Sequence, residues 1–338
     1  MGKISVLGCG WGTALALAAY RNHHDVTMWS PFEEEVRLLK EKHEHEKLLP
    51  GVKIPDDIKI TTDLSEVDGS DFTIIAVPSK FIRQTAVKLK PIKNPGIIVN
   101  ASKGIEEGSL LRLSQVISQE LPGRKVAVLS GPSHAEEVAR EIPTTVVTAS
   151  ENIEVAKQVQ QALMHKTLRI YTNQDVIGVE LGGALKNIIA VCAGICDGLG
   201  LGDNTKAALI TRGLTEIARL GVKMGAMNQT FAGLTGLGDL VVTCTSMHSR
   251  NRRFGILVGQ SVPIDEALER IGTVEGYYAT KTAWQLSQRY GVEMPITYQC
   301  YKTLYENYPV KEVVYNLMLR PGKHELEQEN TWIDRIKE

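Results

Sequence analysis

Residues 179–221 read VELGGALKNIIAVCAGICDGLGLGDNTKAALITRGLTEIARLG, and the rest of the chain is organised around them. The pattern predicts helical segments interrupted by small residues, and residues 188–196 carry no charge, so much of the stretch should be buried. Lys186, followed by Asn187, stands directly before that apolar run. Because burial lowers the pKa of an ammonium group toward neutrality, Lys186 is a candidate for proton transfer. The alternative is a lysine whose stem packs on the core while its head reaches water.

Composition excludes several classes of protein. The 338 residues are enough for two domains, each with its own core. With 38 basic and 39 acidic residues the net charge is −1, so no nucleic-acid partner is expected. The apolar runs fall short of the ~20 residues of a membrane helix, and the N-terminus has no signal-peptide layout, which predicts a cytoplasmic protein. The five scattered cysteines predict reduced, buried thiols and no metal site.

A glycine-rich turn follows the first predicted strand. Residues 3–7 (KISVL) predict a strand, and GCGWGT leads from there into the helical LALAAY at residues 15–20. Such a turn lets the backbone approach a pyrophosphate at the N-terminus of a helix, so Gly8, Gly10 and Gly12 are candidate dinucleotide contacts. A structural turn is the alternative. The spacing G-x-G-x-G is one residue shorter than the usual G-x-G-x-x-G and predicts a tighter loop.

The second predicted strand, residues 25–29 (DVTMW), ends where such folds place an acid for the ribose or an arginine for a 2′-phosphate. Ser30 and Phe32 flank a proline there, and three glutamates follow at 33–35. Neither signature is present. The acidic run favours the absence of a 2′-phosphate, but it also suits the solvated first turn of a predicted helix at 33–42. The choice between NAD and NADP therefore stays open.

Further strands and helices alternate along the first half. Strands are predicted at 72–77, 97–100, 126–129, 144–149 and 168–171, and helices at 109–121 and 153–164. Ligands bind outside the carboxyl ends of parallel strands, so Lys103 in ASKGIE is a site candidate, with an exposed loop lysine as the alternative. Ser133 and Glu136 have the spacing of a capping box. The other interpretation of Ser133 is a helix N-terminus aimed at an anionic substrate. A structural role is expected for His134, with a catalytic base as the alternative.

The strand pattern stops after Val176. We therefore predict an α/β protein, with a Rossmann-like, doubly wound, mostly parallel sheet at 1–176 and an all-α domain at 177–338. Lys186 should open the first long helix of the second domain, beside the cleft. Later helices are expected at 278–290, 296–307 and 310–319, followed by an exposed or frayed helix at 323–338.

Two polar stretches interrupt the helical half. GLGDL places Asp239 in what reads as a tight turn, and VEG at 274–276 reads as another. Ser249, Arg250 and Asn251 precede two more arginines. An arginine beside an amide suits a phosphate or carboxylate, whereas a solvated basic face is the alternative, above all for Arg252 and Arg253.

These motifs resemble a known family. In order, the chain reads GCGWGTALA, IIAVPS, ASKGIE, SGPSHAEEVA, GVELGGALKNIIAVCAGICDGLGLGDNTKAALITRGL, GLTGLGDLVVTCTS, HSRNRRFG and VEG. In order and spacing they are similar to the bacterial NAD(P)-dependent glycerol-3-phosphate dehydrogenases. The resemblance covers all but the tail. It implies reversible hydride transfer between NAD(P)H and dihydroxyacetone phosphate, giving sn-glycerol 3-phosphate for phospholipid synthesis, and a homodimer.

The resemblance also implies roles for individual residues. Lys186 would be the catalytic acid and base. The residues implied around the substrate are Lys103, Gly131, Ser133, Lys186, Asp239, Ser249, Arg250 and Asn251. The residues implied along NAD or NADP are Gly8, Gly10, Trp11, Gly12, Lys103, Ala135, Arg250, Val274 and Glu275.

Three departures from the family pattern all concern the cofactor. The chain lacks the residue that the family carries between Gly10 and Trp11. A single valine, Val274, precedes Glu275 where the family has two, and Pro31-Phe32 replace a basic or imidazole residue. Two other functions stay open: another hydroxyacid or sugar-acid dehydrogenase, and a dinucleotide-binding sensor without catalysis.

Overall fold

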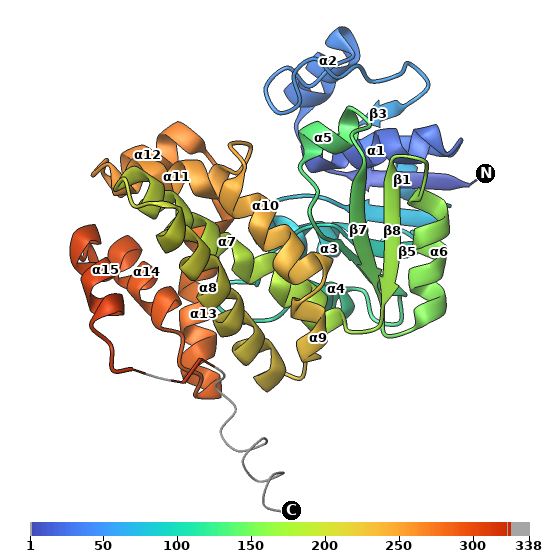
Figure 1. Ribbon diagram of the computed structural model, residues 1–338. Helices are drawn as coiled ribbons and strands as arrows, with labels where there is room; N and C mark the ends of the chain where they lie inside the picture. The colour runs from blue at the N-terminus through green and yellow to red at the C-terminus, as the bar shows by residue number, and fades with distance from the viewer. Residues whose placement is uncertain (1, 323, 326–338) are drawn as a thin grey trace, which may run out of the picture.

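An eight-stranded sheet forms the first domain of the computed structural model, which describes residues 2–322, 324 and 325 (Figure 1). The strands lie in the order β3-β2-β1-β4-β5-β6-β7-β8. Every neighbouring pair is parallel except β6 and β7. The predicted mostly parallel, Rossmann-like sheet is confirmed. The bounds are β1 (Lys3–Leu7), β2 (Asp25–Trp29), β3 (Lys59–Thr61), β4 (Phe72–Ile75), β5 (Ile97–Asn100), β6 (Val126–Ser130), β7 (Thr144–Ala149) and β8 (Leu168–Asn173).

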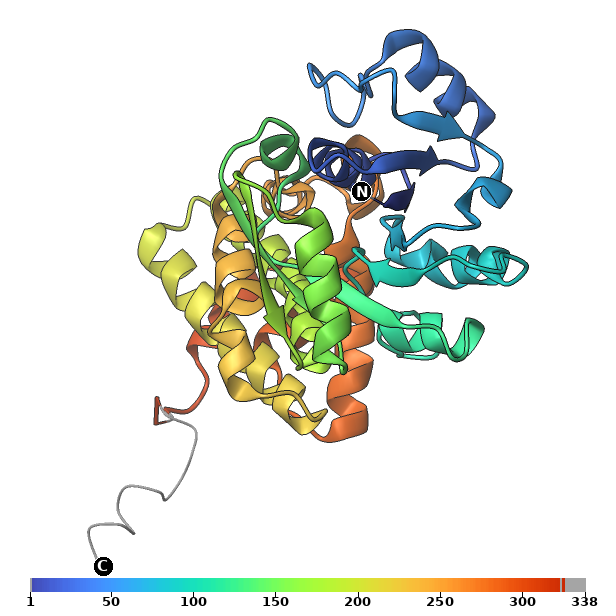
Figure 2. The same cartoon turned by 90° about the vertical axis from the view of Figure 1, so that its right-hand side faces the viewer.

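Helices cover both faces of this sheet (Figure 2). Apolar residues of α1 and α6 pack on one face, and those of α3 and α4 pack on the other. The helix expected at 109–121 begins only at Leu113, because Leu110 has a left-handed φ of 61° and Ile105 pairs with Arg112. The bounds are α1 (Trp11–Arg21), α2 (Glu33–Lys42), η1 (Leu64–Val67), η2 (Ser79–Phe81), α3 (Ile82–Leu89), α4 (Leu113–Glu120), α5 (Ala135–Ala139) and α6 (Ile153–Leu163).

The second domain is helical throughout its described part, as predicted. The exact division at 176/177 stays a prediction, and α7 begins at Val176. Of the tail at 323–338, all but His324 and Glu325 lie outside the described residues. The bounds are α7 (Val176–Gly198), α8 (Asp203–Lys223), α9 (Asn228–Phe231), η3 (Leu234–Gly238), α10 (Asp239–Thr245), α11 (Arg250–Gly259), α12 (Ile264–Ile271), α13 (Glu275–Tyr290), α14 (Pro295–Glu306) and α15 (Val310–Met318).

Helix α7 belongs to both domains. Its first turn packs on strands β6 and β7 through Val176 and Val179, and its remainder forms the centre of the helical core. A side chain at Gly194 would collide with the backbone carbonyl of Arg252, so glycine is what lets α11 approach this closely. Among the described residues, α7 alone is long and apolar enough to cross a membrane, but 89% of its apolar window is buried inside the protein. It is therefore a core helix.

Candidate active site

Two lysines from different domains share one buried carboxylate. Lys186 Nζ, on α7, donates to Asp239 Oδ1 and, at 2.6 Å, to Thr243 Oγ1. Lys103 Nζ, in the loop after β5, donates to Asp239 Oδ2 at 2.6 Å and to the Gly131 carbonyl at 2.8 Å. Lys186 is 6% exposed and Asp239 is 1% exposed. The lysine is therefore not one whose head reaches bulk solvent.

Burial sets the protonation of this cluster. Desolvation lowers the pKa of Lys186 to about 8, although Asp239 works in the opposite direction. Burial also opposes ionisation of Asp239, yet the ammonium groups of Lys103 and Lys186 lower the pKa of that carboxyl below its ordinary value. A lysine with a pKa near 8 holds a proton at neutral pH and can release it, as general acid catalysis requires.

A chain of amides continues from this cluster toward α13. Asn187 lies next to Lys186, and its Oδ1 accepts from Asn251 Nδ2 at 2.9 Å. Asn251 Oδ1 then accepts from the Gly276 backbone N–H at 2.8 Å. Ser249 caps α11 by accepting from the Arg252 N–H at 3.2 Å, and the Arg250 side chain is exposed at the start of that helix. The first turn of α11 thus brings Asn251 against the lysine helix.

The glycine loop has the features of a dinucleotide site. Gly8 has φ +109°, and a Cβ there would lie 2.8 Å from the Ala76 carbonyl, so the backbone needs glycine at this point. Gly10 caps α1 without a side-chain hydrogen bond, which leaves the helix N-terminus open to an anion. The helix starts at Trp11, and Thr13 Oγ1 donates to the Cys9 carbonyl at 2.5 Å, which closes the turn before it. These residues fit a bound pyrophosphate.

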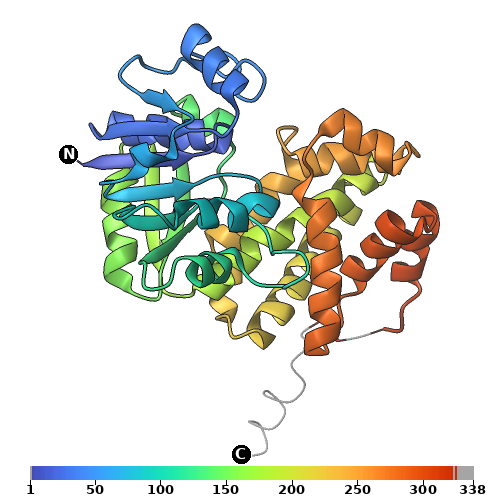
Figure 3. The same ribbon diagram turned by 180° about the vertical axis from the view of Figure 1, so that it is seen from behind.

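The other residues implied for the cofactor lie in both domains. Ala135 begins α5 and packs on the same core as α1. Val274 is buried at the cap of α13. Glu275 accepts from the Ser79 N–H at 3.0 Å and from Ser79 Oγ at 2.5 Å, which ties α13 to the segment after β4. In Figure 3, α13 runs down the side of the helical domain that faces these loops.

Five sequence expectations about this region are wrong. Lys186 lies in the middle of α7 instead of opening it, because Asp175 caps the helix eleven residues earlier. Ser133 does not cap α5: His134 is the cap residue, and Ser133 Oγ donates to Gly131 O at 3.0 Å.

The predicted turns are helical as well. Asp239 follows the π-helical turn η3 and begins α10, and Glu275 begins α13. Arg252 is not on a solvated face, because its Nε pairs with Asp197 at 2.7 Å and its Nη1 donates to Thr245 O.

Several polar groups beside the lysines were not among the predicted site residues. Thr243 accepts a hydrogen bond from Lys186, and Asn187 accepts one from Asn251. Ser79 donates to the Glu275 carboxylate. Ser130 Oγ and His134 Nε2 are buried without a hydrogen-bond partner among the residues that the structure describes. Among residues 2–322 and 324–325, no group of three or more His, Cys, Asp or Glu side chains is arranged to hold a metal ion. All five cysteines are free, and four are buried, as predicted.

A sheet with a glycine-rich loop, joined to a helical domain that carries a buried lysine, defines a two-domain, dinucleotide-dependent oxidoreductase. Models described as the NAD-dependent glycerol-3-phosphate dehydrogenase N-terminus and C-terminus match residues 3–156 and 175–315. The chain belongs to the NAD-dependent glycerol-3-phosphate dehydrogenase family.

Relatives match over the whole length. Glycerol-3-phosphate dehydrogenase (NAD(P)+) of Bacillus pumilus is 55% identical over 334 residues, which cover 97% of this chain and 97% of that protein. The Bacillus velezensis protein of the same name is 52% identical over 345 residues and covers 100% of each chain. The crystal structure of glycerol-3-phosphate dehydrogenase from Coxiella burnetii, 41% identical, has a TM-score of 0.91 and covers 94% of this chain and 99% of that one. The predicted enzyme class and the use of NAD or NADP agree with these relatives.

Proposed function

We propose that this protein catalyses the reversible, NAD(P)H-dependent reduction of dihydroxyacetone phosphate to sn-glycerol 3-phosphate. The observation that carries the proposal is the buried ammonium group of Lys186, paired with Asp239 between the two domains, with a pKa of about 8. The nicotinamide, when bound, supplies the hydride. Reduction of the ketone places negative charge on its C2 oxygen, and Lys186 donates the proton that neutralises it.

The neighbours of Lys186 control the charge and the orientation of its ammonium group. Asp239 keeps Lys186 charged, and Lys103, on the other oxygen of the same carboxylate, adds a second positive charge that favours the developing alkoxide. Thr243 fixes the direction of the ammonium group. In the reverse reaction the neutral lysine would accept the hydroxyl proton.

The phosphate of the substrate is assigned to the start of α11. Arg250 supplies an exposed guanidinium, and the Asn251 amide is held in place by Asn187 and by the Gly276 N–H. Binding the phosphate at a distance from C2 would position the carbonyl against Lys186. Gly131, Ser133 and Ser249 complete the proposed contacts with the substrate. A cytoplasmic location, a supply of glycerol phosphate for phospholipid synthesis and a homodimer belong to the same proposal.

The test is the initial rate of NADH and NADPH oxidation with dihydroxyacetone phosphate, beside the rate with small 2-keto acids. We expect turnover of the phosphorylated ketone and little of the acids. Lys186→Ala should lose several orders of magnitude in kcat with near-normal cofactor binding, whereas Lys157→Ala, at an exposed lysine on α6, should behave as wild type. Preference for a 2-keto acid would indicate a hydroxyacid dehydrogenase. Cofactor binding without turnover of any substrate would indicate a sensor.

A further inference from the structure

A carboxylate is held at the end of strand β2, where dinucleotide folds recognise the adenosine ribose. Glu35, in the first turn of α2, turns back so that its Oε2 accepts from the hydroxyl of Ser30, the residue directly after β2. His45 Nε2 lies 3.2 Å from Oε1 of the same carboxylate. The Phe32 N–H donates to Ser30 Oγ at 3.3 Å, which closes the turn. The position of this carboxylate is therefore set by the fold.

The same carboxylate borders the glycine loop. Cys9, between Gly8 and Gly10, is buried, and its burial and the neighbouring Glu35 raise the pKa of its thiol. The Gly8 N–H donates to the Trp29 carbonyl at 2.9 Å, which holds the loop against the end of β2. A dinucleotide whose pyrophosphate lies on this loop brings its adenosine ribose to that strand end. Glu35 is thus within the ribose site.

The charges around the Glu35 carboxylate are unfavourable for the 2′-phosphate of NADPH. The hydrogen bond from His45 lowers the pKa of Glu35, despite partial burial, so that the group is ionised at neutral pH. Glu33 and Glu34 stand in the same helical turn. Arg37, the arginine of α2, is already bound to Glu34 at 2.6 Å and to Glu41 at 2.7 Å.

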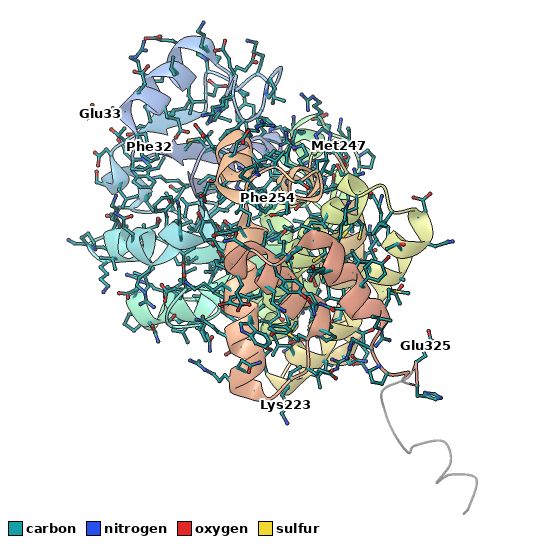
Figure 4. All side chains as sticks on the ribbon, turned by 90° about the vertical axis from the view of Figure 1, so that its left-hand side faces the viewer. Phe32, Glu33, Lys223, Met247, Phe254 and Glu325 are labelled. Atoms are coloured by element: carbon teal, nitrogen blue, oxygen red, sulfur yellow. The ribbon has the colours of Figure 1, made fainter. Side chains whose placement is uncertain are left out.

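Two further basic groups near this strand end also have partners. The Lys88 ammonium lies over the Trp29 ring, 5.6 Å from its centroid. His45 is engaged by Glu35 itself. Two residues after Ser30 the chain presents no basic group but Phe32, 62% exposed, which Figure 4 shows at the surface beside Glu33. An exposed aromatic ring suits the flat face of adenine and offers nothing to an anion.

We propose that Glu35 makes this protein select NADH over NADPH. The ionised carboxylate accepts a hydrogen bond from a ribose 2′-hydroxyl, and it repels a 2′-phosphate, which carries up to two negative charges at the same point. Ser30 and His45 hold the carboxylate there, so that it cannot easily turn away. This selection rests on the proposed function for its physiological meaning, but it concerns binding and is measured without the substrate.

The experiment compares dissociation constants for NADH and NADPH from the quenching of tryptophan fluorescence, in the absence of any ketone. For the wild-type protein we expect NADH to bind on the order of tenfold to a hundredfold more tightly. Glu35→Gln should tighten NADPH binding by about tenfold, weaken NADH binding a few-fold and so remove most of the preference. Glu33→Gln removes the same charge from the same turn without disturbing the Arg37 pairs, and it should leave the ratio of the two constants within about twofold.

Two results would overturn the proposal: equal or tighter binding of NADPH by the wild-type protein, or an unchanged ratio in Glu35→Gln. Ser30→Ala gives a second test, because releasing the carboxylate should reduce the preference without altering net charge, and an unchanged ratio in this variant would also count against it. The same samples, given dihydroxyacetone phosphate, test the enzyme activity separately. A clear preference for NADH in a protein that reduces no ketone would leave this inference standing and refute the proposed function.

Discussion

Replacing Asp239 by asparagine tests the arrangement of the two lysines. The carboxylate is 1% exposed and is bound to Lys186 on one oxygen and to Lys103, at 2.6 Å, on the other. Asparagine keeps the size of the side chain and removes its charge. Two ammonium groups would then face each other in a buried site without an anion, so the charged form of Lys186 becomes less favourable.

The size of the effect follows from the pKa of Lys186. An opposite charge in contact is worth about 1 to 3 pKa units, so the pKa of about 8 should fall to roughly 5 to 7 in Asp239→Asn. Ketone reduction needs the protonated lysine, so activity is lost as the pH rises through this pKa. If the pKa in the variant is about 6, protonation alone lowers kcat/KM about tenfold at pH 7, and the loss diminishes toward pH 5.

The assay is kcat/KM for dihydroxyacetone phosphate between pH 5 and 9.5, because this ratio reports the ionisation of the free enzyme. Thr243→Val removes one hydrogen bond from Lys186 and keeps the ion pair, so its alkaline limb should stay within about one pH unit of wild type. The dissociation constant for NADH shows whether each variant is folded. An alkaline limb in Asp239→Asn that stays near pH 8, or moves upward, would refute the reasoning.

Two further predictions concern stability. Glu180 of α7 is buried, pairs with Arg112 Nη1 at 2.5 Å and accepts from the Ser114 N–H at the start of α4. Glu180→Gln would leave the buried Arg112 guanidinium without its counter-charge. The free energy of unfolding, measured in urea, should therefore fall by about 3 to 5 kcal/mol. Glu216 accepts from the Ile296 N–H at 2.7 Å, and burial raises its pKa from 4.5 to about 7. The folded state therefore keeps a proton that the unfolded chain has released between about pH 4.5 and pH 7, and the stability of wild type relative to Glu216→Gln should fall by about 3 kcal/mol across that window.

Each stability prediction has an outcome that contradicts it. A loss below about 1 kcal/mol in Glu180→Gln, as for an exposed pair such as Lys157 with Glu154, would mean that the ion pair between the domains is not desolvated. For Glu216, a difference from the glutamine variant that is constant from pH 4.5 to 7 would mean that the carboxyl titrates normally in the folded protein.

The sequence predicted the architecture because the signals involved are local. Apolar strand runs, the glycine loop after β1 and the uncharged run in α7 can each be recognised within about ten residues. Strand β3 was missed, since three residues are too few for a period to appear. The reversal between β6 and β7 was not foreseen either, because the direction of a strand depends on the path of its connection.

The site was predictable only in part, for a physical reason. Lys186 was singled out as a charge beside an apolar run, but the resemblance, not the spacing, selected Asp239. The two residues are 53 positions apart, and Thr243 is 57 positions from the lysine, so only the packing of α10 on α7 brings them together. Ser133 shows the converse error: the capping-box spacing was present, but α5 begins at Ala135 with His134 in the cap position, and the Ser133 hydroxyl donates to the Gly131 carbonyl.

Helix α7 is shared between the two halves of the molecule, and this limits how the protein can close around its ligands. Its first turn is packed into the strands, and its later turns are the middle of the bundle. Rotation of one domain against the other would have to bend or displace helix α7, and the Nζ atom of Lys186 would move with the helix. Conformational change on ligand binding should therefore occur at contacts that a few hydrogen bonds maintain, such as the one between Ser79 and Glu275. The proton donor, Lys186, would keep its position.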